Sequence, residues 1–191
     1  MIRRLMQEVA ARAQEALTGG PVPDRRRMHR IEVWVLNGGE HASTEALFAK
    51  AAAALDRIAE AQPWRIGTMQ RDFGRIFIRQ NTGCRAMFDT ARSCVLDTYF
   101  VAVFTPEQVA SSIVHESVHA RLRRDGRVVP ADLIAWEERL CRRAELGFGL
   151  RVPDGAAVVE RAHNALALSD ADVAPLAGNI RLRPTRRRGP G

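Results

Sequence analysis

The sequence predicts an α+β protein, with a small, mostly antiparallel sheet in its N-terminal half and a helical C-terminal half. Two observations support this class. Short β-rich runs separated by brief turns occupy residues 64–104, and apolar residues at helical spacing dominate from residue 105 onward. The chain has 191 residues, which is the length of one domain with a full hydrophobic core.

The first expected helix spans residues 2–17, where apolar side chains recur at helical spacing until the run TGGP at 18–21 interrupts them. A basic linker to about residue 30 follows. Residues 31–36 form a short β-rich run closed by the turn pair Asn37-Gly38, so we expect a strand there.

A second helix is expected from Ser43 or Thr44 to Ala61, because strong helix formers place apolar residues on one face until Pro63 ends the pattern. Short turns then separate four β-leaning segments and favour an antiparallel meander. These segments span residues 64–69, 75–79, 84–89 and 93–104. Three more helices are expected at about 105–124, 130–150 and 155–168.

The composition excludes several classes of protein. Hydrophobic residues make up 46% of the chain and charged residues 27%, values of a folded domain and not of a disordered or fibrous protein. No apolar run approaches the roughly 20 residues of a membrane-spanning helix. The N-terminal apolar stretch contains Glu8, Arg12 and Glu15, so it lacks the uncharged segment of a secretory signal. We therefore expect a cytoplasmic protein that binds no membrane.

The three cysteines, Cys84, Cys94 and Cys141, form no C-x-x-C pair, and an odd number cannot all pair within one chain. We expect reduced thiols, which agrees with a cytoplasmic location.

The positive charge is concentrated at the two ends of the chain. Of the net charge of +7, residues 1–30 contribute +4 and residues 181–191 contribute +5, which leaves the region between them slightly acidic. We expect an N-terminal helix and basic linker at 1–30, a single domain at 31–180, and a disordered arginine-rich tail at 181–191. These ends are typical of solvated tails, with nucleic-acid binding as the alternative.

The chemically informative segment is HESVH, residues 115–119. On a helix, residues four apart lie on the same face, so the imidazoles of His115 and His119 can bind one Zn²⁺. Glu116 would then lie beside the ion. The alternative is that these are ordinary polar residues of an amphipathic helix.

Local signals place this segment on a helix. Thr105 is a good N-cap, Pro106 suits the first helical position, and Gln108 completes a capping box. Asp125-Gly126 supplies a stop. Helical spacing therefore applies to the two histidines.

A catalytic zinc needs a third protein ligand, which the following helix could supply. Glu137 lies within the apolar stripe of that helix, while Glu138 and Glu145 lie at its edge. A carboxylate in an apolar stripe must be bound or neutralised, and pairing with Arg142 or another arginine would serve equally well. Cys141 on the same helix could also bind metal, although a small buried thiol is its simpler role.

HESVH followed by an acidic residue on the next helix resembles the zincin metallopeptidases, and within them the gluzincin pattern with Glu as the third ligand. The order of a helix, a small sheet, the motif helix and a Glu-bearing helix is also similar over residues 31–150. The extended motif of the metzincins, with a Gly and a third His, is absent. The resemblance implies a zincin-like fold and a peptide or protein substrate.

The resemblance also implies a role for each matching residue. His115, His119 and Glu138 would bind one Zn²⁺ per chain, with Glu138 chosen because it lies nineteen residues after His119. Glu116 would be the general base that activates zinc-bound water. The strand at 93–104 would be the edge strand along which an extended peptide adds.

The function expected from these observations is therefore a zinc-dependent metallopeptidase or amide hydrolase. His163 and Tyr99 are possible donors to the oxyanion, although each is also an ordinary residue of its element. The alternative is a non-catalytic protein that keeps a zincin-like scaffold for binding or regulation, associated with nucleic acid through its arginine-rich ends.

Overall fold

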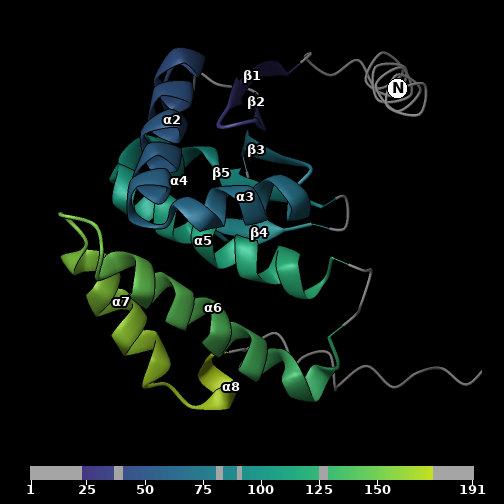
Figure 1. The fold of residues 1–191 in the computed structure, drawn as a ribbon, viewed down its shortest axis with the longest axis vertical. Coiled ribbons are helices and arrows are strands. Elements are labelled where there is room, and N and C mark those ends of the chain that lie inside the picture. The colour runs from purple at the N-terminus through teal and green to yellow at the C-terminus, as the bar shows by residue number, and fades with distance from the viewer. Residues whose placement is uncertain (1–22, 37–40, 81–83, 90–91, 125–128, 174–191) are drawn as a thin grey trace, which may run out of the picture.

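The computed structural model describes residues 23–36, 41–80, 84–89, 92–124 and 129–173, so the predicted helix at 2–17 and the tail at 181–191 lie outside the described residues. The described chain is α+β, as expected, with one five-stranded sheet and helices α2 to α8 (Figure 1). Among the described residues, none of the helices has the length and hydrophobicity that crossing a bilayer requires.

The sheet is mixed, with strand order β1-β2-β3-β5-β4. Its strands are β1 (Asp24–Met28), β2 (Ile31–Val35), β3 (Arg75–Arg79), β4 (Ala86–Phe88) and β5 (Ser93–Asp97). The two outer pairs are antiparallel, whereas β2 pairs with β3 and β3 with β5 in parallel. The expectation of a mostly antiparallel sheet is wrong because helices α2 (Thr44–Ala61) and α3 (Pro63–Asp72) connect β2 to β3, and such a crossover returns the next strand in parallel.

Strand β1 occupies part of the segment that was expected to be a linker. It pairs with β2 through the two-residue turn His29-Arg30, in which both residues have positive φ (46° and 63°). Positive φ at both central positions is the geometry of a type I′ hairpin turn. The sequence lacked the glycine or asparagine that usually marks such a turn, so the hairpin was not predicted.

Two segments expected to be strands are helical. Residues 64–69 belong to α3, whose first residue is Pro63, because proline both ends one helix and suits the first position of the next. In the segment 93–104, β5 ends at Asp97, whose carboxylate accepts a hydrogen bond from the N–H of Phe100. This N-cap starts the short helix α4 (Thr98–Val103), despite the β-branched and aromatic residues in it.

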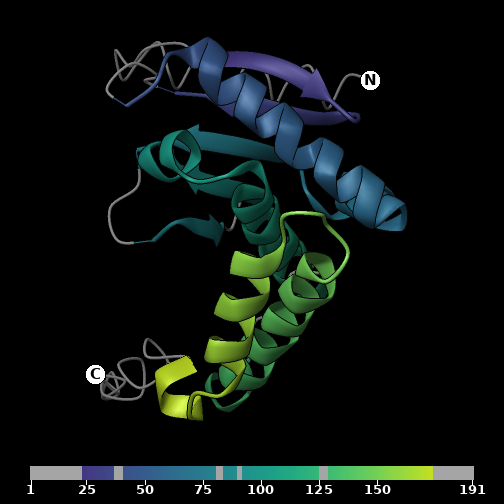
Figure 2. The ribbon, with the colours of Figure 1, turned by 90° about the vertical axis from the view of Figure 1, so that its left-hand side faces the viewer.

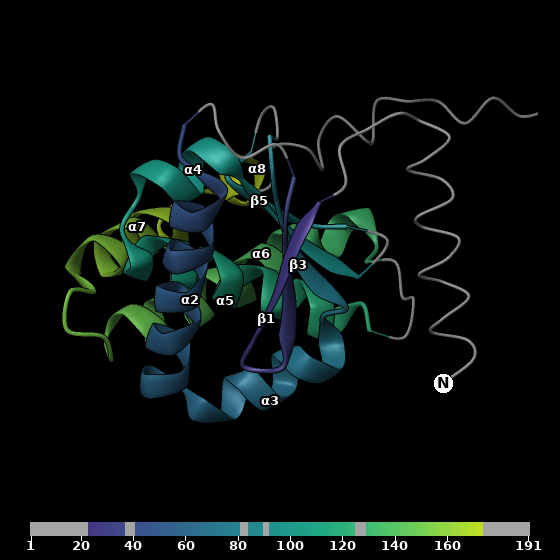
Figure 3. The same cartoon turned by 90° about the horizontal axis from the view of Figure 1, so that it is seen from above.

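Helix α2 confirms the predicted boundaries and forms much of the core. The Ser43 hydroxyl caps it by accepting a hydrogen bond from the N–H of Ala46. One face of the helix is fully buried, comprising Leu47, Phe48, Ala51, Ala54, Leu55 and Ile58. This face contacts β2 and the motif helix α5 (Pro106–Leu122), which lies beside α2 in Figure 3.

The C-terminal half consists of helices, as predicted. A 3₁₀ turn (Ala131–Leu133) leads into α6 (Ile134–Gly149), followed by α7 (Ala156–Leu166) and the short α8 (Asp170–Val173). Figure 2 shows α6 and α7 running side by side below the sheet, and α6 also packs along α5. The predicted capping box of α5 is present, with Thr105 and Gln108 bonding each other's backbone N–H groups.

Two glycines fix the turn between α6 and α7. A Cβ on Gly155 would lie 1.9 Å from the carbonyl oxygen of Gly149, which no side chain can accommodate. By contrast, a Cβ on Gly67 in the middle of α3 would meet nothing within 4 Å. The same substitution should therefore have opposite effects at the two positions.

We expect Gly155→Ala to lower the free energy of unfolding by about 1–3 kcal/mol or more, because the backbone must separate. Gly67→Ala should raise it by about 0.5–1 kcal/mol, because alanine loses less conformational entropy in a helix. Urea denaturation of both variants tests this. Equal effects would mean that α6 and α7 do not approach so closely.

Candidate metal centre

The structure brings the two motif histidines together on α5. Their side chains lie one helical turn apart, and each residue is only 7% exposed. The two Nε2 atoms face each other at 3.2 Å. A pair of ring nitrogens so close in a buried site requires a proton or a cation between the groups.

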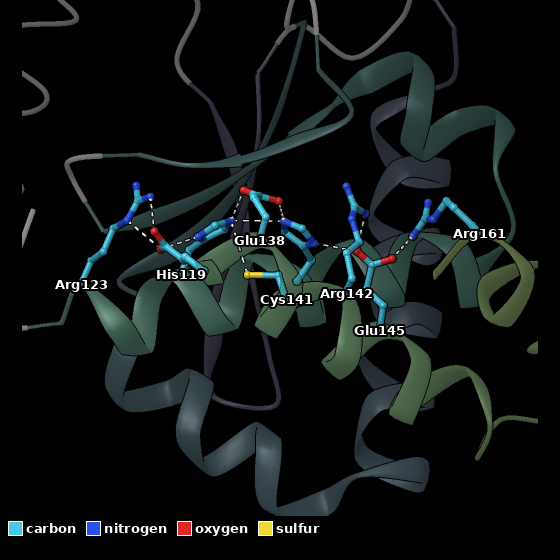
Figure 4. A network of polar contacts seen from close by, with 9 residues as sticks. His119, Arg123, Glu138, Cys141, Arg142, Glu145 and Arg161 are labelled. Carbon is cyan, nitrogen blue, oxygen red and sulfur yellow. Dashed lines mark hydrogen bonds and ion pairs between the residues drawn. The ribbon is translucent and has the colours of Figure 1, made fainter. Parts of the chain in front are cut away.

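Glu138 from α6 lies against both rings. Its Oε2 is 3.3 Å from Nε2 of His115, and its Oε1 is 3.2 Å from Nε2 of His119 (Figure 4). One carboxylate therefore spans the two nitrogens that helical spacing places together. Glu138 is also the residue that the resemblance to the gluzincins implied as the third ligand, because of its distance from His119 in the sequence.

The other two carboxylates of α6 bind the opposite sides of the rings. Glu145 accepts a hydrogen bond from Nδ1 of His115, and Glu137 accepts one from Nδ1 of His119, both at 2.6 Å. These bonds leave each Nε2 directed at Glu138. Carboxylates in this position fix the tautomer and orientation of a metal-binding histidine.

Arginines hold both outer carboxylates. Arg123 donates two hydrogen bonds of 3.0 Å to Glu137, and Glu145 accepts from Arg142 at 2.7 Å and from Arg161 at 2.8 Å. Glu137 and Glu145 are almost fully buried, so these partners compensate the cost of removing the two charges from water. Sequence reasoning weighed Glu137 as a metal ligand or an arginine partner and Glu145 only as a metal ligand, whereas the structure gives both of them arginine partners.

The ionisation of the site follows from these contacts. Burial lowers the pKa of the imidazoles, but the bonds to Glu138 and Glu145 outweigh it and raise the pKa of His115 to about 10. Against the same burial effect, the contacts of His119 with Cys141 and the glutamates raise its pKa to about 12. Although burial raises the pKa of Glu145, its bond to His115 and the nearby arginines bring that pKa down to about 2. The site thus favours positive charge between its carboxylates.

Cys141 is a further donor beside the histidines. Its Sγ lies 3.6 Å from Nε2 of His119, and the donor atoms of His115, His119 and Cys141 all lie within 4.8 Å of one another. Cys141 follows Glu138 by three residues, so both project from the same face of α6. Imidazole, thiolate and carboxylate groups bind transition metals, zinc among them, and His115, His119 and Cys141 form a buried group that could hold a metal ion.

Glu116 lies on the adjacent side of α5 and is 5% exposed. Burial raises the pKa of its carboxyl group, which makes it a better proton acceptor. Together with His115 it lines a cavity of about 390 Å³ between the start of β4 and helices α5, α6 and α7. Glu116 therefore faces a space next to the candidate metal donors.

Sequence reasoning missed the support that α3 gives to the motif. Arg65 from α3 donates a hydrogen bond of 3.0 Å to the hydroxyl of Ser117, and both residues are buried. Because residues 64–69 were expected to form a strand, this contact was not foreseeable. The sequence showed a serine between the two histidines, but the burial of Ser117 and its bond to Arg65 became apparent only in the structure.

Two residues considered as oxyanion donors lie elsewhere. His163 is exposed on α7, and Tyr99 is 53% exposed and packs edge-on against His41. Neither lines the cavity beside Glu116. The predicted edge strand is also wrong, because β5 lies between β3 and β4, and β4 is the edge strand near α5.

Comparison with known proteins adds no assignment, since no protein-family model, curated protein or solved structure matches the chain significantly.

A first prediction for the metal centre distinguishes Glu138 from Cys141 as the third donor. We expect Glu138→Ala to weaken zinc binding by more than about 100-fold, which exceeds the loss typical of a residue that only hydrogen-bonds to a metal ligand. The zinc affinity of Cys141→Ser should stay within about tenfold of wild type. Competition with a chromophoric chelator measures both affinities, with the exposed Glu160→Ala as control. A comparable loss of zinc affinity in Cys141→Ser would show that the thiol of Cys141 is a ligand.

The second prediction concerns the carboxylates behind the rings. Glu145→Gln keeps the shape of the side chain but removes its charge, so zinc affinity should fall by about 10–100-fold without being abolished. Glu137→Gln should behave alike. Asp170→Asn is the matched control, since Asp170 is an exposed carboxylate bound to Arg139 at 2.7 Å. Unchanged affinity in Glu145→Gln would contradict the orienting role.

Proposed function

We propose that the protein is a zinc-dependent hydrolase of amide bonds, a metallopeptidase that holds one Zn²⁺ per chain through His115, His119 and Glu138. The observation that carries the proposal is the convergence of two buried Nε2 atoms and one carboxylate on a single point, next to the cavity that Glu116 lines. A site of this donor set with a neighbouring carboxyl group is suited to hydrolysis.

The residues of the chain have distinct parts in this chemistry. Zinc, when bound, supplies a Lewis acid that acidifies water and polarises a carbonyl group. The Glu116 carboxylate accepts the proton of the attacking water and returns it to the nitrogen of the leaving amine. Burial raises the pKa of the Glu116 carboxyl group toward neutral pH, which makes the carboxylate a better proton acceptor. Glu137 and Glu145 hold the Nδ1 protons, so that both Nε2 lone pairs face the donor site.

One observation favours a second candidate function. Cys141 lies close enough to His119 to complete a set of four protein donors with His115 and Glu138. Four protein ligands are typical of structural zinc sites, which leave no position for water. On this reading the protein is a zincin-like binding or regulatory protein, and its arginine-rich ends associate it with nucleic acid.

The cytoplasm remains the proposed location. Cys94 and Cys141 are buried thiols that form no disulfide, and such thiols persist in a reducing compartment.

The hydrolase proposal makes a prediction that separates metal binding from turnover. His115→Ala and His119→Ala should each lose zinc, whereas Glu116→Gln should keep about one zinc per chain and lose hydrolysis, because only the proton acceptor is gone. Metal analysis and cleavage of a broad library of quenched fluorescent peptides measure these two properties.

His163→Ala is the control, because it removes an exposed histidine that does not line the cavity and should change neither property. Zinc retained in both motif histidine variants would contradict the site. Wild type that holds zinc but cleaves no library peptide would favour the binding protein.

A further inference from the structure

The cavity beside the candidate metal centre is lined by an unusual number of guanidinium groups. Its volume of about 390 Å³ lies within the range of small-ligand pockets. The side chains of interest in its wall are Arg85, Arg142, Arg161, His115, Glu116 and Glu145. Three arginines therefore converge on the space that a substrate of the proposed hydrolase would enter.

Two of these arginines share one carboxylate. Arg142 and Arg161 both bind Glu145, which also accepts the hydrogen bond from His115. Nε of Arg161 is buried and has no hydrogen-bond partner among the described residues. The wall as a whole holds the three guanidinium groups of Arg85, Arg142 and Arg161 against the two carboxyl groups of Glu145 and Glu116, so it carries surplus positive charge.

Arg85 is the third arginine, and it forms no ion pair among the described residues. Its guanidinium lies over the ring of Phe104, 4.7 Å from the centroid, and 5.9 Å from that of Phe100. The carbonyl oxygen of Arg85 accepts a hydrogen bond of 2.9 Å from the N–H of Asp97 in β5. Stacking and this backbone bond hold the exposed Arg85 side chain in place. A ligand that binds it therefore loses little free energy to the ordering of this side chain.

The charges around Arg85 favour the binding of an anion beside its guanidinium group. Partial burial and the neighbouring charges of Arg161 and Arg142 lower the pKa of Arg85, because each disfavours the charged form. A bound carboxylate would relieve this repulsion. The planar fork of a guanidinium matches a carboxylate with two parallel hydrogen bonds.

We propose that Arg85 binds a carboxylate of the substrate, so that the site acts on acidic peptides, with an Asp or Glu side chain or a free C-terminal carboxylate near the cleaved bond. This inference rests on the proposed hydrolase for its substrate class. The binding of the anion itself depends only on the cavity.

Binding to zinc-loaded Glu116→Gln, in which turnover is blocked, tests the inference. The probes are three N-acetylated pentapeptides measured by isothermal titration calorimetry: Ala-Ala-Glu-Ala-Ala amide, its Gln counterpart, and penta-alanine with a free C-terminal carboxylate. We expect at least one carboxylate peptide to bind about tenfold tighter than the Gln amide, as for one charge-assisted hydrogen bond. The tighter of the two identifies the side chain or the chain end as the source.

Arg85→Gln in the same background should remove this preference. Arg75→Gln is the matched control, because Arg75 also stacks on two rings, at 4.6 Å from that of Trp34 and 5.7 Å from that of Phe77, but does not line the cavity. Equal binding of all three peptides, or a preference that survives Arg85→Gln, would overturn the inference. Zinc content and thermal unfolding of each variant confirm an intact fold.

Cleavage by the wild-type chain separates this inference from the proposed function. Selective binding that depends on Arg85, with no cleavage of any peptide, would remove the hydrolase and keep the anion site. Cleavage of all three peptides at equal rates, with equal affinities, would keep the hydrolase and remove the anion site.

Discussion

Two buried imidazoles that face each other at 3.2 Å are the constraint on which the rest of the structure depends. Such a pair is unfavourable unless positive charge is stabilised around it, and the protein surrounds it with carboxylates. Glu138 lies between the rings, Glu137 and Glu145 lie behind them, and arginines close both ends of the chain of contacts (Figure 4). Opposite charges alternate along this chain, so each buried group has a partner. Protons on the rings or a divalent cation can each supply the positive charge at its centre.

The fold provides this arrangement through two helices and their connections. Helix α6 contributes Glu137, Glu138, Cys141 and Glu145. Cys141 lies four residues after Glu137, three after Glu138 and four before Glu145, so these side chains lie near one another on the side of α6 that packs against α5. The close approach of Gly155 to Gly149 then returns the chain into α7 directly against α6. That turn is what allows an arginine of α7 to bind Glu145. The backbone approach far from the motif thus helps to set the orientation of a histidine ring.

The sequence predicted those features that local signals determine. The capping box at Thr105 marked the start of α5, and helical spacing then placed His115 and His119 together. It could not separate the roles of the three glutamates of α6, because all lie at or near the same helix face and the deciding partners, Arg123 and Arg161, come from other segments. The sheet was less predictable still. Pro63 was interpreted only as the end of a helix, although it begins α3. That error placed a strand at residues 64–69, joined to β3 by a short turn, and so predicted an antiparallel pair where β2 and β3 pair in parallel.

Whether the site catalyses or only binds depends on which side of the histidine pair is open. Glu138 and Cys141 approach the pair from α6, whereas Glu116 lies on α5 in the wall of a cavity that residues of β4, α6 and α7 also line. A purely structural site needs neither a buried carboxyl group beside its ligands nor an adjoining space, because its ligands come from the protein alone. Burying the carboxyl group of Glu116 there costs stability, because burial removes it from water. The placement of Glu116 in the cavity wall is what the proposed hydrolysis requires, whereas a structural metal site does not require it.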